Sequence, residues 1–202
     1  MKNSIIVVCL AIIAGILVFI QCTQGTASDP PAETPEANFG GFSTQEQWGE
    51  HLVTIAACHD CHTPKKMGPH GPMLDSTRLL SGHPATMPPP DVDRKEMESK
   101  GLAVTDMLTA WVGPWGISFT ANLTSDPTGI GNWKEENFIM AIREGKLKGI
   151  PSGRALLPPM PWEMYRNMTD DELKAIFAFL KTTTPISNVV PQPVPPVSPP
   201  PQ

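Results

Sequence analysis

The sequence predicts an all-α domain of moderate size with long loops. Apolar residues recur at helical spacing in three stretches, and each stretch opens with residues that commonly start helices. Between residues 63 and 118 proline, glycine and methionine recur too often for long elements. No run of alternating apolar and polar residues indicates a strand. The chain has 202 residues, 24 of them proline, which leaves room for one folded domain between unstructured ends.

The first predicted helix leads directly into the sequence ACHDCH at residues 57–62. Ser43 and Glu46 have the spacing of a capping box at its start. The apolar residues that then recur at helical spacing are Trp48, Leu52 and Ile55.

Two further helices are predicted in the second half of the chain. Asn132 with Glu135 is expected to cap one of them, and Gly145 to end it. Thr169 with Glu172 is expected to cap the other. Their apolar stripes consist of Trp133, Phe138, Ile139 and Ile142 in the former and Leu173, Ile176, Phe177 and Leu180 in the latter. Between the first and second helices, residues 105–112 are the best candidate for a short helix.

The first 22 residues predict an export leader. An uncharged, almost wholly apolar run follows Lys2 over residues 5–20, short for a helix that must cross about 30 Å of hydrocarbon. Cys22 resembles the lipid-modified cysteine of bacterial lipoproteins, although Gln21 replaces the small residue usual before it. We therefore expect a cell-envelope protein that faces the periplasm and is anchored to the membrane through lipidated Cys22. An uncleaved helical anchor and a freely soluble exported form are the alternatives.

The ends of the mature chain are predicted to be disordered. Residues 23–41 are rich in proline, alanine and acidic residues and have no apolar period, which favours a flexible linker. Eight prolines among the last 18 residues favour an extended, disordered tail over residues 187–202. The folded domain is therefore expected over residues 42–186. The net charge of −5 disfavours nucleic acid as a partner.

ACHDCH contains Cys58, Cys61 and His62, a pattern open to three interpretations. A structural zinc site uses four protein ligands, but the expected folded domain contains a single pair of cysteines. A redox dithiol would stand near a strand–helix junction, whereas the segment before this pair is predicted to be helical. Covalent haem attachment accounts for all three residues, because both thiols can add to one porphyrin and the next histidine can bind its iron. We therefore expect one covalently attached haem c.

Three stretches resemble the class I c-type cytochromes of bacterial respiratory chains. They are CHDCH, residues 122–145 and residues 157–182, and together they are similar to monohaem modules found alone or within dehydrogenase cytochrome subunits. The resemblance implies a small helical domain wrapped around one covalent haem, with the first helix packed across the last. It also implies that a methionine just before the last helix is the sixth iron ligand, which places Met160 in that role.

Met160 stands between two prolines in the sequence PPMPW. Pro159 and Pro161 fix φ on both sides and keep the methionine out of a helix, so a stiff loop can hold its weak thioether on iron. Met164 is an alternative ligand, and His51, His70 and His83 are others that would give a bis-histidine haem.

His62 and Met160 together would leave no iron position open for a substrate. We therefore expect an electron-transfer protein and not an enzyme: a monohaem c-type cytochrome that carries single electrons between redox partners such as membrane dehydrogenase or oxidase complexes. One alternative is a haem-bearing accessory subunit of a larger oxidoreductase, with residues 63–118 and the proline-rich tail as its interface. The other is a haem enzyme or sensor with an open iron site.

Overall fold

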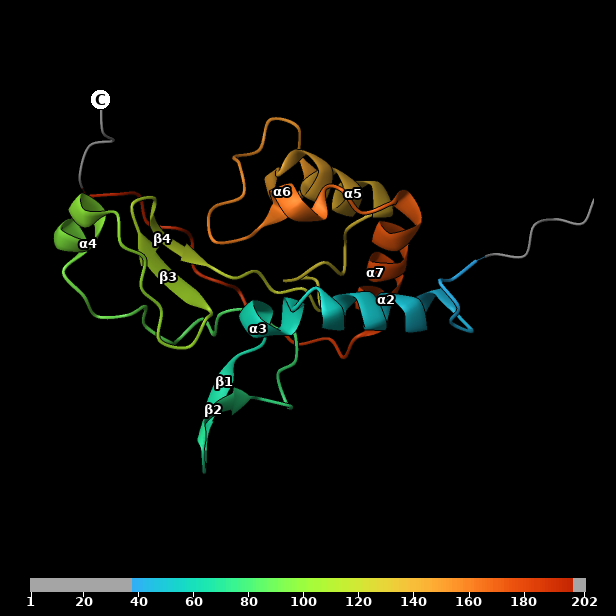
Figure 1. Ribbon diagram of the computed structural model, residues 1–202, viewed down its shortest axis with the longest axis horizontal. Coiled ribbons are helices and arrows are strands. Elements are labelled where there is room, and N and C mark those ends of the chain that lie inside the picture. The colour runs from blue at the N-terminus through green and yellow to red at the C-terminus, as the bar shows by residue number, and fades with distance from the viewer. Residues whose placement is uncertain (1–37, 198–202) are drawn as a thin grey trace, which may run out of the picture. The chain divides into compact units, whose positions relative to one another are not determined.

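The computed structural model describes residues 38–197, whose elements are arranged as Figure 1 shows. The predicted leader, its Cys22 and the linker up to residue 37 lie outside the described residues, as do residues 198–202. In chain order the elements are α2 (Gln45–Ile55), α3 (Cys58–His62), β1 (Lys65–Gly68), β2 (Gly71–Leu74), α4 (Arg94–Lys100), β3 (Ala110–Gly113), β4 (Gly116–Phe119), α5 (Glu135–Glu144), the 3₁₀ helix η1 (Leu147–Gly149), α6 (Trp162–Tyr165) and α7 (Asp170–Thr182). Within residues 38–197 no helix has both the length and the apolar character needed to cross a bilayer.

The expected all-α fold is wrong, because two small antiparallel sheets accompany the helices. β1 pairs with β2, and β3 pairs with β4. Each strand has four residues, and none alternates between buried and exposed positions: β1 and β2 contain no buried residue, whereas β3 and β4 are mostly buried. Alternation in the sequence therefore could not reveal them. The prediction of a short helix over residues 105–112 is also wrong, because Ala110–Gly113 is strand β3.

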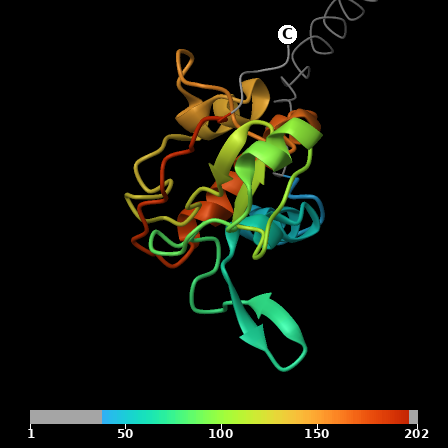
Figure 2. The same ribbon diagram turned by 90° about the vertical axis from the view of Figure 1, so that its left-hand side faces the viewer.

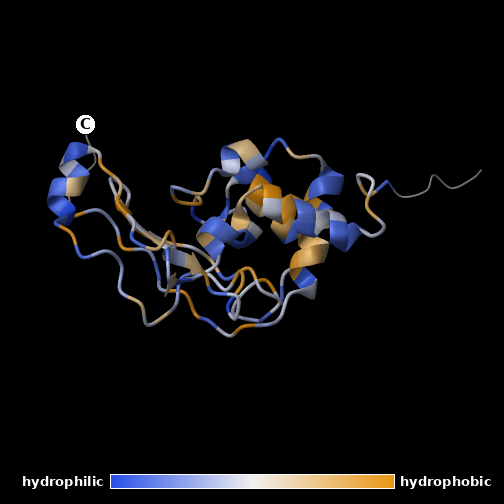
Figure 3. Ribbon diagram, turned by 60° about the horizontal axis from the view of Figure 1, so that its bottom comes forward, coloured by the Kyte–Doolittle hydropathy of each residue, from blue (hydrophilic) through white to orange (hydrophobic). Residues whose placement is uncertain are grey.

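Helices α2 and α7 pack across one another, which confirms the expected pairing of the first and last helices. Leu52 and Val53 of α2 share one apolar core with Leu173, Ile176 and other residues of α7. The crossing is so close that a Cβ added at Gly49 would lie 1.9 Å from the Ala175 carbonyl oxygen. Figure 3 shows apolar residues concentrated where these helices meet.

The residues that cap the helices are the predicted ones or lie one or two positions from them. The Thr169–Glu172 capping box is present at α7, and Gly145 ends α5 with φ 60°. At α2 the capping side chain is Thr44, which accepts a hydrogen bond from the Gln47 N–H, and not the expected Ser43. The cap of α5 is Lys134, whose N–H bonds the Asn137 side chain, and not the expected Asn132.

The β3–β4 sheet is extended by one bridging residue at each edge. Val104 pairs with Val112 of β3, and Val194 pairs with Ile117 of β4. The second pairing belongs to the segment that we expected to be part of a disordered tail from residue 187. Residues 187–197 instead run along the domain, where the buried Asn188 donates hydrogen bonds to the carbonyls of Ser81 and His83 at 2.7 and 2.8 Å. Extended, proline-rich backbone can still pair at a sheet edge through its non-proline residues.

The β1–β2 hairpin extends away from the helices in both views (Figure 2). Its strands pair only with each other among the described residues, and its methionines are largely exposed: Met67 is 69% and Met73 49% accessible. The hairpin begins three residues after His62, so it interrupts the chain immediately beyond the CHDCH helix.

We expect Gly49→Ala to destabilise the fold by about 2–3 kcal/mol, because the new methyl group would overlap the Ala175 carbonyl and force α2 and α7 apart. Helix propensity alone would favour alanine by about 1 kcal/mol, so the sign of the change in the free energy of unfolding separates the two effects. Urea unfolding measures the change. Gly101→Ala is the comparison, since a Cβ there meets no atom within 4 Å and only its φ of 66° is unfavourable, at about 1 kcal/mol. A stability at Gly49→Ala equal to or above that of the parent would contradict the packing argument.

Candidate functional site

CHDCH forms its own short helix, α3, separate from α2. Ala57 between them has φ 55° and ψ 29°, a left-handed conformation that costs an alanine about 1 kcal/mol. Its carbonyl nevertheless accepts a hydrogen bond from the Asp60 N–H, so this residue ends one helix and begins the next. The strained position turns the backbone immediately before Cys58, and residues outside the favoured regions often occur beside functional groups.

Both cysteines are half-buried, and no disulfide joins them. Burial raises the pKa of Cys58 to about 11, with a further contribution from the neighbouring Cys61, and burial also raises the pKa of Cys61. Redox dithiols need a lowered thiol pKa, because the thiolate is the reactive form. This pair has the opposite character, which disfavours the redox-dithiol interpretation.

His62 is buried, with 9% of its surface exposed, and is fixed from two sides. Its Nδ1 donates to the Ala121 carbonyl at 2.8 Å, and its own carbonyl accepts from the Gly82 N–H at 2.8 Å. Burial lowers the pKa of the ring, so the imidazole is neutral at pH 7. With Nδ1 protonated and engaged, the lone pair of Nε2 is left for a ligand. A histidine that binds a metal has this arrangement, with the second nitrogen donating to a carbonyl.

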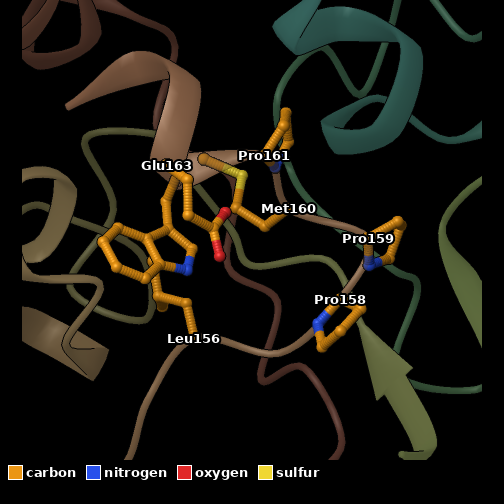
Figure 4. A pocket seen from close by; sticks show the side chains of 7 residues that line it. Leu156, Pro158, Pro159, Met160, Pro161 and Glu163 are labelled. Carbon is orange, nitrogen blue, oxygen red and sulfur yellow. The ribbon is translucent and has the colours of Figure 1, made fainter. Parts of the chain in front are cut away.

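Met160 lies in a tight loop that starts with a hydrogen bond from its N–H to the Leu157 carbonyl at 3.3 Å. The loop borders a pocket of about 200 Å³, and Figure 4 shows the Met160 thioether and the Glu163 carboxylate together at it. The other lining residues are Leu156, Pro158, Pro159, Pro161 and Trp162. Met160 is only partly buried and packs against the same apolar core as Cys58.

Two hydrogen bonds tie the Met160 loop to the rest of the site. The Ser118 hydroxyl, in β4, donates to the Pro158 carbonyl at 2.6 Å. On the other side of the loop the Tyr165 hydroxyl donates to the Ala56 carbonyl at 2.7 Å, just before the CHDCH helix. The segment after β4 also holds His62, through Ala121. β4 and its continuation therefore contact His62 on one side and the loop before Met160 on the other, through Ala121 and Ser118.

The alternative iron ligands are placed differently. His83 is fully buried, and both ring nitrogens are occupied: Nε2 donates to the Met87 carbonyl at 2.8 Å, and Nδ1 accepts from the Thr109 hydroxyl at 2.9 Å. His51 is exposed and stacks on Phe42, with ring centroids 4.9 Å apart. His70 lies exposed in the β1–β2 hairpin.

Met164 and a zinc site are also disfavoured. Met164 is 68% exposed on α6. Across the part of the chain that the structure describes, no group of three or more histidine, cysteine, aspartate or glutamate side chains could hold a metal ion. A zinc ion at Cys58 and Cys61 would therefore lack the further protein ligands that a structural site needs.

Sequence reasoning did not find the hydrogen bonds that support the expected ligands. Ser118, Ala121 and Tyr165 act through one hydroxyl, one backbone carbonyl and one phenol, and each contacts a residue between 40 and 109 positions away in the chain. Such contacts have no local pattern.

Comparisons with known proteins find similarity to components of dehydrogenases. The chain is 34% identical over 164 residues to the cytochrome c subunit of alcohol dehydrogenase (quinone) from Komagataeibacter europaeus, covering 80% of this chain and 26% of that protein. It is 33% identical over 135 residues to the fructose dehydrogenase cytochrome subunit from Gluconobacter japonicus, covering 66% and 20%. A nicotinate dehydrogenase subunit from Pseudomonas putida is 38% identical over 79 residues, covering 39% and 6%.

The chain thus spans about a quarter or less of each relative's length. No family model matches it. The similarity to cytochrome c subunits supports a c-type cytochrome domain, haem c as its cofactor and electron transfer as its task.

We expect the stability of the domain to fall as the pH drops below about 6.5, in part through His83. Burial lowers the pKa of this ring in the folded state, so the unfolded chain takes up the proton first and acid favours unfolding. Above about pH 7 the contribution of His83 to the free energy of unfolding no longer changes with pH. Urea unfolding at about pH 7.5 and about pH 5.5 measures it, and His83→Gln, which cannot be protonated, should reduce the loss. Equal losses in parent and variant would show that His83 does not titrate on unfolding.

Proposed function

We propose that this chain is a haem-bearing electron-transfer subunit of a larger dehydrogenase complex in the cell envelope. The observation that carries the proposal is the environment of His62: a buried, neutral imidazole whose Nδ1 is engaged by the Ala121 carbonyl and whose Nε2 is left for iron. The similarity to cytochrome c subunits of dehydrogenases supports the same function.

The residues present fit one covalently attached haem c. Cys58 and Cys61 would hold the porphyrin through thioether bonds. A thioether sulfur carries no ionisable proton, so the raised thiol pKa values do not conflict with this role. His62 and Met160 would bind the haem iron. When bound, the haem supplies a centre that takes up and releases one electron at a time.

The chain's own residues set the conditions for that transfer. Ala121 fixes the tautomer and the orientation of His62, and Ser118 and Tyr165 hold the Met160 loop at its two ends. A thioether is a weaker electron donor to ferric iron than a second imidazole, so this ligand pair favours the reduced state relative to a bis-histidine site. Apolar packing of Cys58 and Met160 against the core limits the access of water.

We further propose that the domain is tethered to the periplasmic side of a membrane by lipidated Cys22, with residues 23–41 as the linker. A tether of this kind raises the effective concentration of the domain at a membrane dehydrogenase. The proposed partner is the subunit that oxidises the substrate, from which the electrons come.

Absorption spectra of the purified, exported protein test the ligand set. We expect the narrow bands of a reduced c-type haem and, in the oxidised protein, the weak far-red band of a sulfur ligand. Met160→Ala should abolish the far-red band and lower the reduction potential, while Met164→Ala, on the exposed face of α6, should leave both unchanged. A far-red band that survives Met160→Ala but disappears in Met164→Ala would reassign the ligand.

The proposal that the chain belongs to a complex is tested by purifying the tagged chain from cells that make it and by separating the product on a sizing column. We expect the haem absorbance to elute with a dehydrogenase activity, measured with an artificial electron acceptor, at a mass well above the 21.9 kDa of the chain. Elution of the haem protein alone would favour a free electron shuttle between complexes. Binding of cyanide by the oxidised parent without displacement of a sulfur band would favour an open-site enzyme or sensor.

A further inference from the structure

Strand β4 and its continuation contact both of the segments that carry the proposed axial ligands. Ser118 donates to the Pro158 carbonyl, two residues before Met160, and the Ala121 carbonyl accepts from His62 Nδ1. Residues 118 and 121 are three positions apart, a span of at most about 11 Å even in a fully extended chain. One short stretch of backbone therefore fixes the relative positions of the histidine and the methionine loop.

Ser118 has a defined hydrogen-bonding direction. Trp115 Nε1 donates to the Ser118 oxygen at 3.0 Å, and an indole N–H can only donate. The single hydroxyl hydrogen of Ser118 is then free to go to the Pro158 carbonyl, at 2.6 Å. Ser118 is 7% exposed, so water cannot readily replace this bond, and its loss leaves the carbonyl without its partner.

The strand that carries Ser118 is itself held on both edges. β3 pairs along one edge, and on the other the Ile117 N–H donates to the Val194 carbonyl at 2.8 Å while the Val194 N–H donates to the Ile117 carbonyl at 3.0 Å. Gly116 allows this approach, because it has φ 95° and any Cβ there would lie 2.1 Å from the Val194 oxygen. A rigid strand can hold a loop in place, whereas a mobile one would move with it.

We propose that Ser118 is a positioning residue for Met160. Its hydrogen bond to Pro158 holds the proline-rich loop closed, and the closed loop keeps the thioether at the iron. Loss of the bond increases the fraction of molecules in which the loop opens and the sixth iron position becomes available to other ligands. The inference rests on the proposed function and assigns to Ser118 a role that neither the haem motif nor the PPMPW sequence indicates.

Imidazole binding to the oxidised, haem-loaded full-length chain is the test. Imidazole replaces a methionine ligand only when the loop is open, so its apparent dissociation constant is inversely proportional to the open fraction. Disappearance of the far-red sulfur band reports the replacement. We expect Ser118→Ala to tighten apparent imidazole binding about fivefold to tenfold, the effect of one buried hydrogen bond. Ser118→Thr, which keeps the hydroxyl, should restore the parent affinity.

Ser125→Ala is the matched control. Ser125 also donates from its hydroxyl to a backbone carbonyl at 2.6 Å, that of Thr183, but this bond joins the chain before α5 to the end of α7. We expect this variant to lose thermal stability without changing imidazole affinity. Trp115→Phe, which removes the donor to Ser118 but leaves the hydroxyl, should produce a smaller change in the same direction as Ser118→Ala.

The outcomes separate the inference from the proposed function. Equal imidazole affinities in Ser118→Ala, Ser125→Ala and the parent, with the far-red band present, would overturn the role of Ser118 and leave the Met160 ligand intact. A parent without the far-red band would overturn both. In a Met160→Ala background Ser118→Ala should have no further effect on imidazole affinity, and a persisting effect would show that Ser118 acts on something other than the methionine.

Discussion

The hydrogen bond from His62 Nδ1 to the Ala121 carbonyl decides what the CHDCH helix can do. It selects the tautomer, leaves Nε2 as the only nitrogen with a free lone pair, and fixes the plane of the ring. It also joins the helix to residues 63–121, since the same segment that accepts this bond continues from β4. Without it a buried neutral histidine would have an unsatisfied N–H, a cost of about 1–3 kcal/mol. The placement of the Met160 loop depends on the same segment.

The parts of the fold that could be predicted are those with a local pattern. The stripe on α7, its capping box and the glycine that ends α5 follow from residues within a few positions of each other. The pairing of α2 with α7 came from the resemblance to c-type cytochromes. Helix α4 was missed, because its seven residues, RKEMESK, carry no apolar stripe, although Asp93 and Gly101 cap it as the rules for helix ends describe. The strands were missed because their burial does not alternate.

The residues of the candidate site also divide into those that a local sequence pattern predicts and those that it does not. The motif that contains Cys58, Cys61 and His62 is local, and so is the proline context of Met160, so the sequence predicts these residues as candidates. Their partners could not be predicted, since a hydroxyl at Ser118 or a carbonyl at Ala121 becomes informative only when the chain brings it near a particular atom. Likewise, nothing in the composition of the proline-rich segment indicates that Val194 meets Ile117, where a glycine at 116 makes room for it.

Residues 63–118 thus supply contacts that hold the proposed iron site together. The chain leaves the CHDCH helix through the β1–β2 hairpin, returns so that Gly82 donates to the His62 carbonyl, and then builds the sheet that carries Ser118. In the C-terminal segment, Val194 pairs with Ile117 at the edge of β4 opposite β3. Because histidine, methionine loop, sheet and C-terminal segment are linked by hydrogen bonds between residues distant in sequence, they should gain and lose order together. In the proposed function such coupling would keep the surroundings of the haem similar in both oxidation states, which is the condition for electron transfer with little structural change.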